Sequence, residues 1–544
     1  MISLALDLGT SGFRAQAIDA DGKVIVTSIS TRHPLPGANV MDHLHFCLEL
    51  GQDITHKLIL NAVHRVIHTL PVDLNEVRRV AICGNPIQLS LFQKMEFRDL
   101  AFAGKRKLKK LGITEPIKRP ARVIKAVDFG LELPDDAELF VPPAVKHEIG
   151  ADALAMMYVT GLLDRDEFAI VTDYGTNAEM AIKLGGDILT GSAASGPALE
   201  GQHVSFGMLA QPGAISDITP NGNAWDTVVL GADLISGRGV CVSPTDGTIV
   251  RGGEQCLKAI GVTGTGVIAA LSEGIEARII GPPDIRTPNH RVYLSESIYM
   301  TEKDVKEAGK AIGAIRAGHM TLVEETGAKL SQLDAVYMTG ASGYYVDPLK
   351  ARNVGLIPNS ARKVVQAGNT SLRLAAEIVR NPHLLDLLQR VADSITAKHI
   401  MFADSKAFKN AFVCELAFWN EGMPAGQMNS MLAIYNIQPF PTPHPAPELI
   451  RIANRDIIEI GPLGLKIVDK VGTDLNLDFP PECLGQECRK CIENCPEAAA
   501  RVEVVDGKEV IAIRSDLCDG TACRRCEMEC PMQLSFENIR IREA

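Results

Sequence analysis

Two stretches of the chain share one pattern, in which apolar runs alternate with short polar turns. The first, SLALDLGTSGFRAQAIDADGKVIV, starts at Ser3 and has turns at residues 9–11 and 21–22. The second, FAIVTDYGTNAEMAIKLGGDILTGS, starts at Phe168 and has turns at 175–177 and 185–186. Short apolar runs bounded by glycine and polar turn residues predict three β-strands in each stretch. Two similar β-meanders imply that the chain contains two similar α/β halves.

Each meander places an acidic side chain, Asp7 or Asp173, at the end of its first strand and beside a glycine turn. Backbone N–H groups and hydroxyls of such turns can face phosphate oxygens. We therefore expect the two hairpins to hold one polyphosphate, with both aspartates binding Mg²⁺ through water and placed to orient an attacking water. The expected phosphate-binding residues are Gly9, Thr10, Ser11, Gly175, Thr176, Asn177 and Glu179.

A third glycine-rich element follows a short apolar strand. In AVYMTGASGYYVDP, a predicted strand over 335–339 runs into Gly340, Ala341, Ser342 and Gly343, whose small size lets the backbone approach a flat ring or a ribose. A single Asp-x-Gly-Thr is an ordinary turn, whereas two copies in matching contexts followed by this element favour a nucleotide site. The arrangement resembles the superfamily of actin, sugar kinases and heat-shock ATPases. That resemblance implies ATP binding between two α/β lobes that open and close.

The C-terminal region carries a second repeat. The runs CLGQECRKCIENCP and CDGTACRRCEMECP have the same spacing, C-x4-C-x2-C-x3-C-P, and begin 35 residues apart, at 483 and 518. Disulfides need no such repeat, and zinc sites usually use two C-x2-C pairs separated by a longer loop. Four thiolates close together and the Cys-Pro ending follow the run of the two-cluster ferredoxins. Iron–sulfur clusters are therefore favoured, with structural zinc as the alternative.

In the two-cluster pattern, the fourth cysteine of each run ligates the other cluster. One [4Fe-4S] cluster would then be held by Cys483, Cys488, Cys491 and Cys530. The other would be held by Cys495, Cys518, Cys523 and Cys526. The first loop of each run has four intervening residues where the ferredoxin pattern has two, which bears on the roles of Cys483 and Cys518. Between the runs, RVEVVDGKEVIAI alternates about an Asp506-Gly507 turn and predicts a β-hairpin.

Composition narrows the possible partners and the compartment. The chain has 544 residues, 5% aromatic residues and a formal net charge of −11, so we expect no binding to nucleic acid or to an anionic membrane. It has no uncharged apolar run of about 18 residues and no signal-peptide pattern, which favours a cytoplasmic protein. In that compartment, the scattered cysteines are expected to be small buried hydrophobes. They are Cys47, Cys83, Cys241, Cys256 and Cys414.

Six stretches narrow the resemblance to one family. They are AICGNPIQLSLF (81–92), DYGTNAEMAI (173–182), SAASGPALEGQHVSFGMLAQPGAI (192–215), AIGAIRAGHMTLVEETG (311–327), MTGASGYYVDPLKARNVGLIP (338–358) and AGNTSLRLAAEIV (367–379). They resemble the reductive activators of corrinoid proteins, and the resemblance covers nearly the whole chain. In that family an iron–sulfur domain is fused to an ATPase of this fold, and the activator returns inactive Co(II) corrinoid to Co(I) at the expense of ATP.

The order of domains resembles one branch of that family. Many members begin with a [2Fe-2S] domain, whereas this chain begins on the ATPase strand and places its cysteine runs last, like the methylamine-specific activators of methanogenic archaea. We expect a first ATPase lobe over 1–160, a second lobe with closing helices over 161–437, a linker and docking segment over 438–475, and a two-[4Fe-4S] ferredoxin domain over 476–544. In the linker, QPFPTPHPAPE is expected to be an extended spacer, and IEIGPLGLKIVDK is expected to hold one more strand or docking element.

Three further features are open to two interpretations. Residues 104–125 carry nine Lys or Arg and are expected to form a solvated face, with docking of an acidic partner as the alternative. The small-residue loop 192–201 is either a tight connection or a place where a ligand or partner approaches. Five early histidines are expected to be ordinary surface or core residues, although the last two share a helix face. They are His43, His45, His56, His64 and His68.

The resemblance implies ATP-dependent reductive activation of a corrinoid protein for methyl transfer from methylamines in methanogenesis. Its partners would be a methylamine-type corrinoid protein and a low-potential electron donor protein, and its cofactors would be two [4Fe-4S] clusters and ATP with Mg²⁺. The alternatives are a small-molecule kinase with a redox-sensing domain, an activator of a radical dehydratase, and an ATP-gated scaffold for corrinoid-protein assembly.

Overall fold

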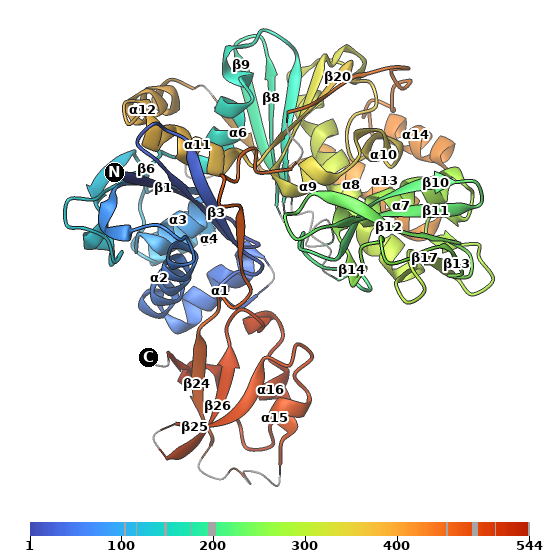
Figure 1. Ribbon diagram of the computed structural model, residues 1–544. Helices are drawn as coiled ribbons and strands as arrows, with labels where there is room; N and C mark the ends of the chain where they lie inside the picture. Colours follow the sequence, from blue (N-terminus) through green and yellow to red (C-terminus); the bar gives the residue numbers. More distant parts are fainter. Residues whose placement is uncertain are drawn as a thin grey trace. The chain divides into compact units, whose positions relative to one another are not determined.

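The computed structural model describes most of the chain as two compact units (Figure 1). The first unit comprises residues 1–152, 374–392 and 460–544, and the second comprises 153–373 and 393–459. The described residues are 1–37, 39–102, 105–115, 117–145, 149–175, 177–193, 198, 203–395, 397–452, 455–480, 483, 488–505 and 507–541.

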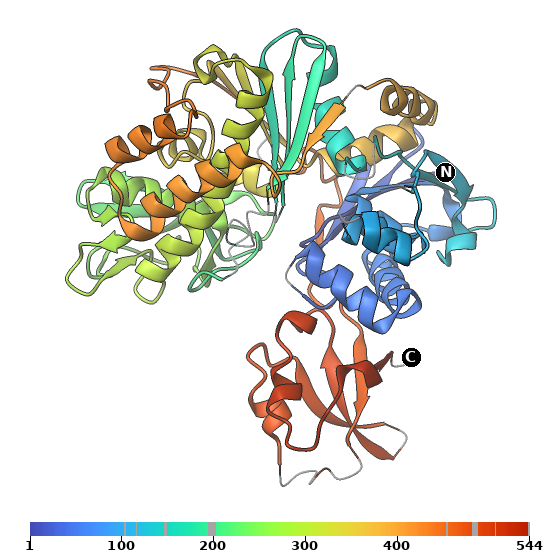
Figure 2. The same ribbon diagram turned by 180° about the vertical axis from the view of Figure 1, so that it is seen from behind.

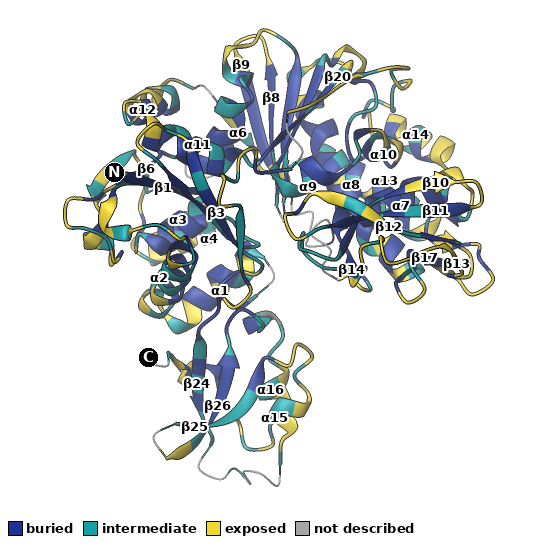
Figure 3. Cartoon of the chain, in the orientation of Figure 1, coloured by how far each residue is buried: buried dark blue, intermediate teal, exposed yellow. Residues whose placement is uncertain are grey.

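The first unit is built on a seven-stranded sheet in the order β23-β3-β2-β1-β4-β6-β5. Its strands are β1 (Ile2–Leu8), β2 (Phe13–Ile18), β3 (Val24–Ser30), β4 (Val77–Gly84), β5 (Arg122–Lys125), β6 (Glu138–Val141) and β23 (Leu465–Val468). Strands β1 to β3 form the predicted antiparallel meander, and β4 adds parallel to β1. Every residue of β1 is buried, as expected for a central strand covered on both faces (Figure 3).

The second unit repeats this plan in a seven-stranded sheet with the order β21-β9-β8-β7-β19-β20-β22. Its strands are β7 (Ala169–Tyr174), β8 (Ala178–Leu184), β9 (Asp187–Ala193), β19 (Ala335–Thr339), β20 (Lys363–Gly368), β21 (Ala397–Ile400) and β22 (Glu448–Arg451). The second predicted meander and the predicted strand over 335–339 are both confirmed. In both sheets, one parallel strand pairs with the first strand of the meander: β4 with β1, and β19 with β7. Another parallel strand pairs with the last strand of the meander: β23 with β3, and β21 with β9.

Helices cover both sheets. Those wholly in the first unit are α1 (Val40–Leu50), α2 (Gln52–His68), α3 (Pro86–Phe92), α4 (Arg98–Ala101) and α5 (Lys105–Lys110). Those at the unit boundaries are α6 (Ala151–Val159), α11 (Thr370–Arg380) and α12 (Leu384–Ser394). Those wholly in the second unit are α7 (Gly264–Glu276), α8 (Glu302–Thr326), α9 (Gly340–Tyr345), α10 (Pro348–Asn353), α13 (Lys406–Glu421) and α14 (Ala425–Ile434).

A five-stranded sheet and two hairpins complete the second unit. The strand order of this sheet is β13-β12-β11-β10-β14, and the two hairpins are β15-β16 and β17-β18. The sheet strands are β10 (Ala214–Asn221), β11 (Ala224–Leu230), β12 (Ser236–Val242), β13 (Ile249–Arg251) and β14 (Gly261–Val262). The hairpin strands are β15 (Ile280–Gly281), β16 (Asp284–Ile285), β17 (Arg291–Tyr293) and β18 (Tyr299–Thr301).

The predicted closing helix over 408–419 is the centre of α13, which packs along α8. Two glycines of α8 make this close packing possible, since a Cβ on Gly309 would lie 2.5 Å from Trp419 and one on Gly313 would lie 2.7 Å from Glu415. The completely buried Trp419 therefore fills the space next to Gly309 and joins the core of the second unit.

The cysteine-rich region forms a small four-stranded sheet in the order β25-β26-β24-β27, drawn in red in Figures 1 and 2. Its strands are β24 (Asp474–Asp478), β25 (Ala500–Val505), β26 (Lys508–Arg514) and β27 (Arg540–Ile541). The antiparallel pair β25 and β26 confirms the predicted hairpin, although Asp506 lies outside the described residues. The short helices α15 (Lys490–Glu493) and α16 (Arg525–Met528) each begin inside one cysteine run and contact each other.

The segment predicted to be a spacer is extended, but it is not free. Within the second unit, His444 N–H donates to the Asn359 carbonyl at 2.9 Å, and Phe440 stacks 3.4 Å from the Arg316 guanidinium. The segment then adds β22 to the edge of the second sheet. This part of the chain is therefore an extended segment whose backbone is held by the body of the second unit. The predicted extra strand is confirmed as β23.

Two smaller expectations concern burial and length. Four of the scattered cysteines are buried as expected, whereas Cys256 is only half-buried. In the described part of the chain, no helix combines the length and the apolar character needed to cross a membrane.

Candidate functional site: two hairpins and two cysteine runs

The first predicted phosphate hairpin joins β1 to β2. Asp7 is almost buried, with 4% of its surface exposed, and its carboxylate pairs with the Arg14 guanidinium at 3.2 Å. Gly9 sits where a Cβ would lie 2.9 Å from the Gly12 carbonyl, so a larger residue would deform the turn. Thr10 accepts a hydrogen bond from Asn85 Nδ2 at 3.0 Å. The sequence motif locates this turn, but nothing in it points to the contact with Asn85.

The second hairpin lies directly against the third glycine element. Thr339 Oγ1 donates to the Asp173 carboxylate at 3.1 Å, and a Cβ on Gly340 would lie 2.6 Å from Asp173 Oδ1. Gly340 also has a φ of +79°, which favours glycine. Glu179 is the partner of Asp173 in the register of β7 and β8. The structure therefore gathers Asp173, Glu179 and Gly340 at one edge of the second sheet.

The other predicted members of this set differ in their surroundings. The element over 340–343 begins helix α9 instead of forming an open loop. Gly343 faces inward, because a Cβ there would lie 3.0 Å from the ring of Tyr174. Gly175 has room for a Cβ at 3.6 Å from Asp173 Oδ1, and Thr176 lies outside the described residues.

Helix α9 is fixed by polar contacts that the sequence did not predict. Gln366 Nε2 donates to the carbonyls of Gly343, Tyr344 and Val346 at 2.6–3.1 Å. Tyr345 donates its hydroxyl to buried Asp456 at 3.1 Å. Burial, with the Asp456 charge beside it, raises the pKa of Tyr345, so this hydroxyl remains a donor. The helix beside Asp173 is thus tied to the chain segment that follows β22.

Cysteines of the two runs lie side by side in the C-terminal region. One cavity of the C-terminal region is lined by Cys518, Cys523 and Cys526 of the second run together with Cys495 of the first. Burial, together with the nearby Cys526 and Cys495 thiols, raises the pKa of Cys518 to about 12. Such thiols ionise only beside a strong positive charge, which is what a bound metal supplies.

Cys491 of the first run is influenced by a cysteine of the second run as well. Burial raises the pKa of Cys491, and the next largest influence is Cys530 of the other run, followed by Cys483 and Cys488. Eight thiol donors are therefore drawn from the two runs, a donor set that suits iron–sulfur ligation.

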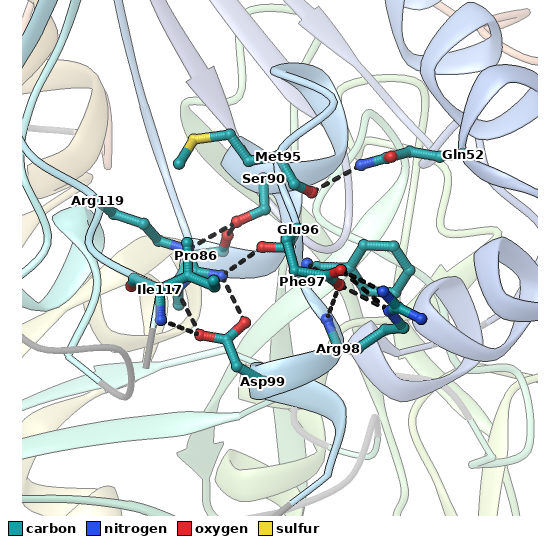
Figure 4. A network of polar contacts seen from close by, with 10 residues as sticks. All are labelled: Gln52, Pro86, Ser90, Met95, Glu96, Phe97, Arg98, Asp99, Ile117 and Arg119. Atoms are coloured by element: carbon teal, nitrogen blue, oxygen red, sulfur yellow. Dashed lines mark hydrogen bonds and ion pairs between the residues drawn. The ribbon is translucent and has the colours of Figure 1, made fainter. Parts of the chain in front are cut away.

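Arg119 departs from the predicted solvated basic face. Its guanidinium binds the Asp99 carboxylate at 2.8 and 3.0 Å, and both side chains are buried (Figure 4). It also donates to Ser90 Oγ of α3 at 2.9 Å. Removing one partner of a buried pair leaves an uncompensated charge, so Arg119 has a structural role. The prediction is confirmed on α5, where Arg106, Lys107, Lys109 and Lys110 are exposed.

The early histidines divide into two groups. His64 and His68 stack on one helix face with ring centroids 5.9 Å apart, and both lie within 4 Å of the exposed carboxylate of Glu132. His43 is completely buried, and burial lowers its pKa to about 3. Of the loop 192–201, only Ser192, Ala193 and Ala198 are described, so the two interpretations of this loop remain predictions.

Comparison with known proteins adds the family. Residues 167–429 match "C-terminal domain of RACo the ASKHA domain", and residues 2–165 match "RACo middle region". A protein of Methanosarcina barkeri, "[Co(II) methylated amine-specific corrinoid protein] reductase", is 47% identical over 96% of both chains. This chain belongs to the family of reductive activators of corrinoid proteins. The resemblance found in its motifs is therefore confirmed, and the actin-like ATPase fold is confirmed with it.

Two more distant proteins are also similar to this chain. The "Corrinoid activation enzyme RamQ" of Eubacterium limosum is 22% identical over 77% of this chain and 71% of its own. Among solved structures, a "Reductive activator for corrinoid, iron-sulfur protein" superposes with a TM-score of 0.64 at 22% identity, covering 76% of this chain and 66% of that one. At this identity the structural match shows only that the two proteins share a fold. Neither family match includes the cysteine runs at 483–531.

Proposed function

We propose that this activator reduces the Co(II) form of a methylated-amine-type corrinoid protein to Co(I) in a reaction that requires Mg-ATP. The observation that carries the proposal is the joint presence of two phosphate-type hairpins and eight cysteines in two matching runs, in one chain whose relative is named for this substrate. The physiological methyl donors would be methylamines used in methanogenesis, and a low-potential protein would supply the electrons.

The nucleotide would bind at the two hairpins and at the start of α9. Asp7 and Asp173 would hold Mg²⁺ through water. The turn after the first strand of each meander would offer its backbone N–H groups to phosphate oxygens. Support comes from the near burial of Asp7 and from the contact of Gly340 with Asp173, because both aspartates keep fixed positions at the edge of their sheets.

The C-terminal region would be a ferredoxin domain with two [4Fe-4S] clusters. Cys483, Cys488, Cys491 and Cys530 would hold one cluster. Cys495, Cys518, Cys523 and Cys526 would hold the other. When bound, such clusters supply one-electron transfer at potentials that burial and hydrogen bonds to sulfur adjust.

ATP has a definite thermodynamic task in this proposal. A mismatch of about 59 mV in a one-electron transfer costs about 1.4 kcal/mol. Nucleotide can offset that cost only if it binds one conformation of the protein better than another. The role of the two hairpins is therefore to favour a conformation in which electron transfer to cobalt is downhill.

Reconstitution with purified components tests the function. Cluster-loaded protein, a low-potential reductant and a Co(II) methylated-amine corrinoid protein are mixed without oxygen, and Co(I) absorption is followed with and without Mg-ATP. We expect Co(I) only with Mg-ATP. Cys491→Ser should abolish it, whereas Cys256→Ser, outside both runs and only half-buried, should not. Failure with both methylated-amine-type and methanol-type partners, despite full clusters and ATP turnover, would overturn the proposal.

A further inference from the structure

A continuous series of contacts leads from the first hairpin to the second cysteine run, entirely inside the first unit. It begins at Thr10, which accepts from Asn85 Nδ2. The side-chain oxygen of Asn85 accepts from Gln88 N–H at 2.8 Å and caps helix α3, and Pro86 occupies the first turn of that helix. Any displacement of the hairpin therefore acts directly on the start of α3.

Gln88 continues the series into the protein interior. It is completely buried, and its amide makes two contacts: Oε1 with His33 Nε2 at 3.1 Å and Nε2 with His43 Nδ1 at 2.9 Å. The two imidazole rings stack with centroids 3.8 Å apart. One amide thus holds two stacked rings from two segments, the loop after β3 and helix α1.

The protonation states of this group are fixed by its contacts. Leu35 N–H donates to His33 Nδ1 at 3.1 Å, so the proton of neutral His33 is on Nε2 and Gln88 must present its oxygen there. Gln88 then donates its N–H to His43 Nδ1. Burial lowers the pKa of both histidines, which keeps both rings neutral at pH 7. These contacts fix the orientation of the Gln88 amide, with its oxygen toward His33 and its nitrogen toward His43.

The series ends on the loop that carries the second cysteine run. Gly37 N–H donates to the Cys518 carbonyl at 2.9 Å. A Cβ on Gly520 would lie 2.9 Å from Pro36, so the two loops are in close contact. Arg524 forms an ion pair with Glu49 of α1, the helix that carries His43. The second run therefore rests on the same loop and helix that Gln88 holds together.

We propose that this series of contacts couples nucleotide binding at the first hairpin to the position of the loop 518–526. We call the series the relay. Its members are Thr10, Asn85, Gln88, His33, His43, Leu35 and Gly37. The inference rests on the proposed function, because it assigns Gln88 and its neighbours as positioning residues for that reaction. Of these residues, only Thr10 belongs to the proposed nucleotide site, and none is a proposed cluster ligand.

A rigid relay suits this task for a physical reason. Loose side chains would absorb a displacement of the hairpin, whereas a buried group of hydrogen-bonded side chains moves as a unit or breaks at a cost. Nucleotide binding should therefore act on the second cysteine run through the loop that holds Leu35 and Gly37.

Hydrogen–deuterium exchange of the cluster-loaded full chain, with and without a non-hydrolysable ATP analogue and Mg²⁺, tests the relay. In the wild type we expect exchange to change at residues 9–12, at the Leu35 and Gly37 amides and at 518–523. In Gln88→Leu we expect the change at 9–12 to persist and the changes at the other sites to disappear. Gln93→Leu makes the same substitution at the end of α3, outside the relay, and should behave as the wild type.

A second variant covers the case in which Gln88→Leu does not fold. Asn85→Ser keeps a good helix cap but is too short to reach Thr10, so it should give the same loss of coupling. In both variants ATP-dependent Co(I) formation should fall about tenfold or more while ATP turnover is retained.

Three other outcomes overturn one or both ideas. Unchanged responses at Gly37 and 518–523 in Gln88→Leu or Asn85→Ser would refute the relay and leave the proposed function intact. A wild type that responds at 9–12 but not at Gly37 would do the same. A wild type that shows no response to nucleotide anywhere would refute the ATP site of the proposed function, and the relay with it.

Discussion

At the scale of single residues, Gly340 shows why the second hairpin and the third glycine element belong to one site. Its positive φ and its contact with Asp173 Oδ1 leave no room for any side chain. The sequence shows the glycine, but only the structure shows that the constraint comes from the predicted Mg²⁺-binding carboxylate.

Gly340→Ala should therefore displace Asp173. A Cβ at 2.6 Å from a carboxylate oxygen, together with φ of +79°, forces the carboxylate or the helix start to move. We expect ATP turnover to fall by about tenfold or more, since a shift of about 1 Å at such a group costs up to 100-fold. The control is Gly186→Ala in the turn between β8 and β9, where a Cβ meets nothing within 4 Å. Equal activity of the two variants would contradict the assignment of Asp173.

Three completely or nearly buried histidines predict sensitivity to acid. Burial lowers the pKa of His43 and of His319 to about 3, and that of His33 well below its ordinary value. Below pH 6.5 these histidines bind protons in the unfolded chain but stay neutral in the folded chain. Stability is therefore complete above that pH and is lost as pH falls toward the folded pKa, by about 1.4 kcal/mol per pH unit for each histidine.

The comparison that isolates this effect uses one variant and one control. The apparent melting temperature should fall between pH 7 and pH 5.5. The fall should be smaller in His43→Gln, because this variant lacks one of the histidines that stay neutral in the folded protein. The exposed His383 offers the control, since His383→Gln should keep the wild-type pH dependence. If His43→Gln and the wild type lost stability in parallel, His43 would not be neutral in the folded protein.

At the residue level, sequence motifs indicate candidate chemistry only where the residues concerned are close together in the chain. Asp7, Asp173 and the eight cysteines stand in short motifs that can be read directly. Gln88 and Asp456 could not be found in this way, because their partners lie far along the chain. Gln88 contacts a residue 55 positions away, and Tyr345 reaches one 111 positions away.

At the scale of elements, the alternating pattern predicted strands correctly but could not assign their partners. The pattern over 458–470 predicted one more strand, and the structure pairs it as β23 with β3, an element more than 400 residues earlier. Parallel pairing of two distant strands leaves no turn signal in the sequence. Likewise, proline content predicted an extended segment after residue 438 but not the surface that binds it.

The pairing of β23 has a proline test with an internal control. Thr27 and Thr31 N–H groups donate to the carbonyls of Gly464 and Val468, so in a parallel ladder Lys466 returns an N–H to β3 while Ile467 points its own to the open edge. Lys466→Pro should speed exchange of the Thr27 and Thr31 amides, and Ile467→Pro should change it much less. Equal effects of the two prolines would refute this register.

The crossed cysteine runs allow a test by combination of variants. Replacing Cys483, Cys488 and Cys491 by serine should leave one cluster and about four iron atoms per chain. Adding Cys495→Ser should remove that cluster, because Cys495 lies with the second run. Adding Cys530→Ser instead should leave it in place. Iron content and the electron paramagnetic resonance of the reduced protein distinguish the two, and the opposite pattern would mean that each run binds its own cluster.

At the scale of the whole molecule, the duplicated sheet plan was predictable because each half carries its own meander. Which chain segments make up each compact unit was less predictable, since residues 374–392 and 460–544 both join the first unit. This connectivity matters for function, because it places the cysteine runs and the first hairpin in one unit. The cysteine-rich region and the first lobe of the ATPase fold therefore belong to one compact unit.

The most direct measurement is a single-turnover experiment. Cluster-loaded protein is reduced, the reductant is removed, and the protein is mixed with an excess of Co(II) methylated-amine corrinoid protein with or without Mg-ATP. We predict about two Co(I) per chain with Mg-ATP, one for each cluster, and almost none without nucleotide or in Asp173→Asn. Equal Co(I) yields with and without Mg-ATP, or ATP hydrolysis with no Co(I), would contradict the claim that nucleotide drives this electron transfer.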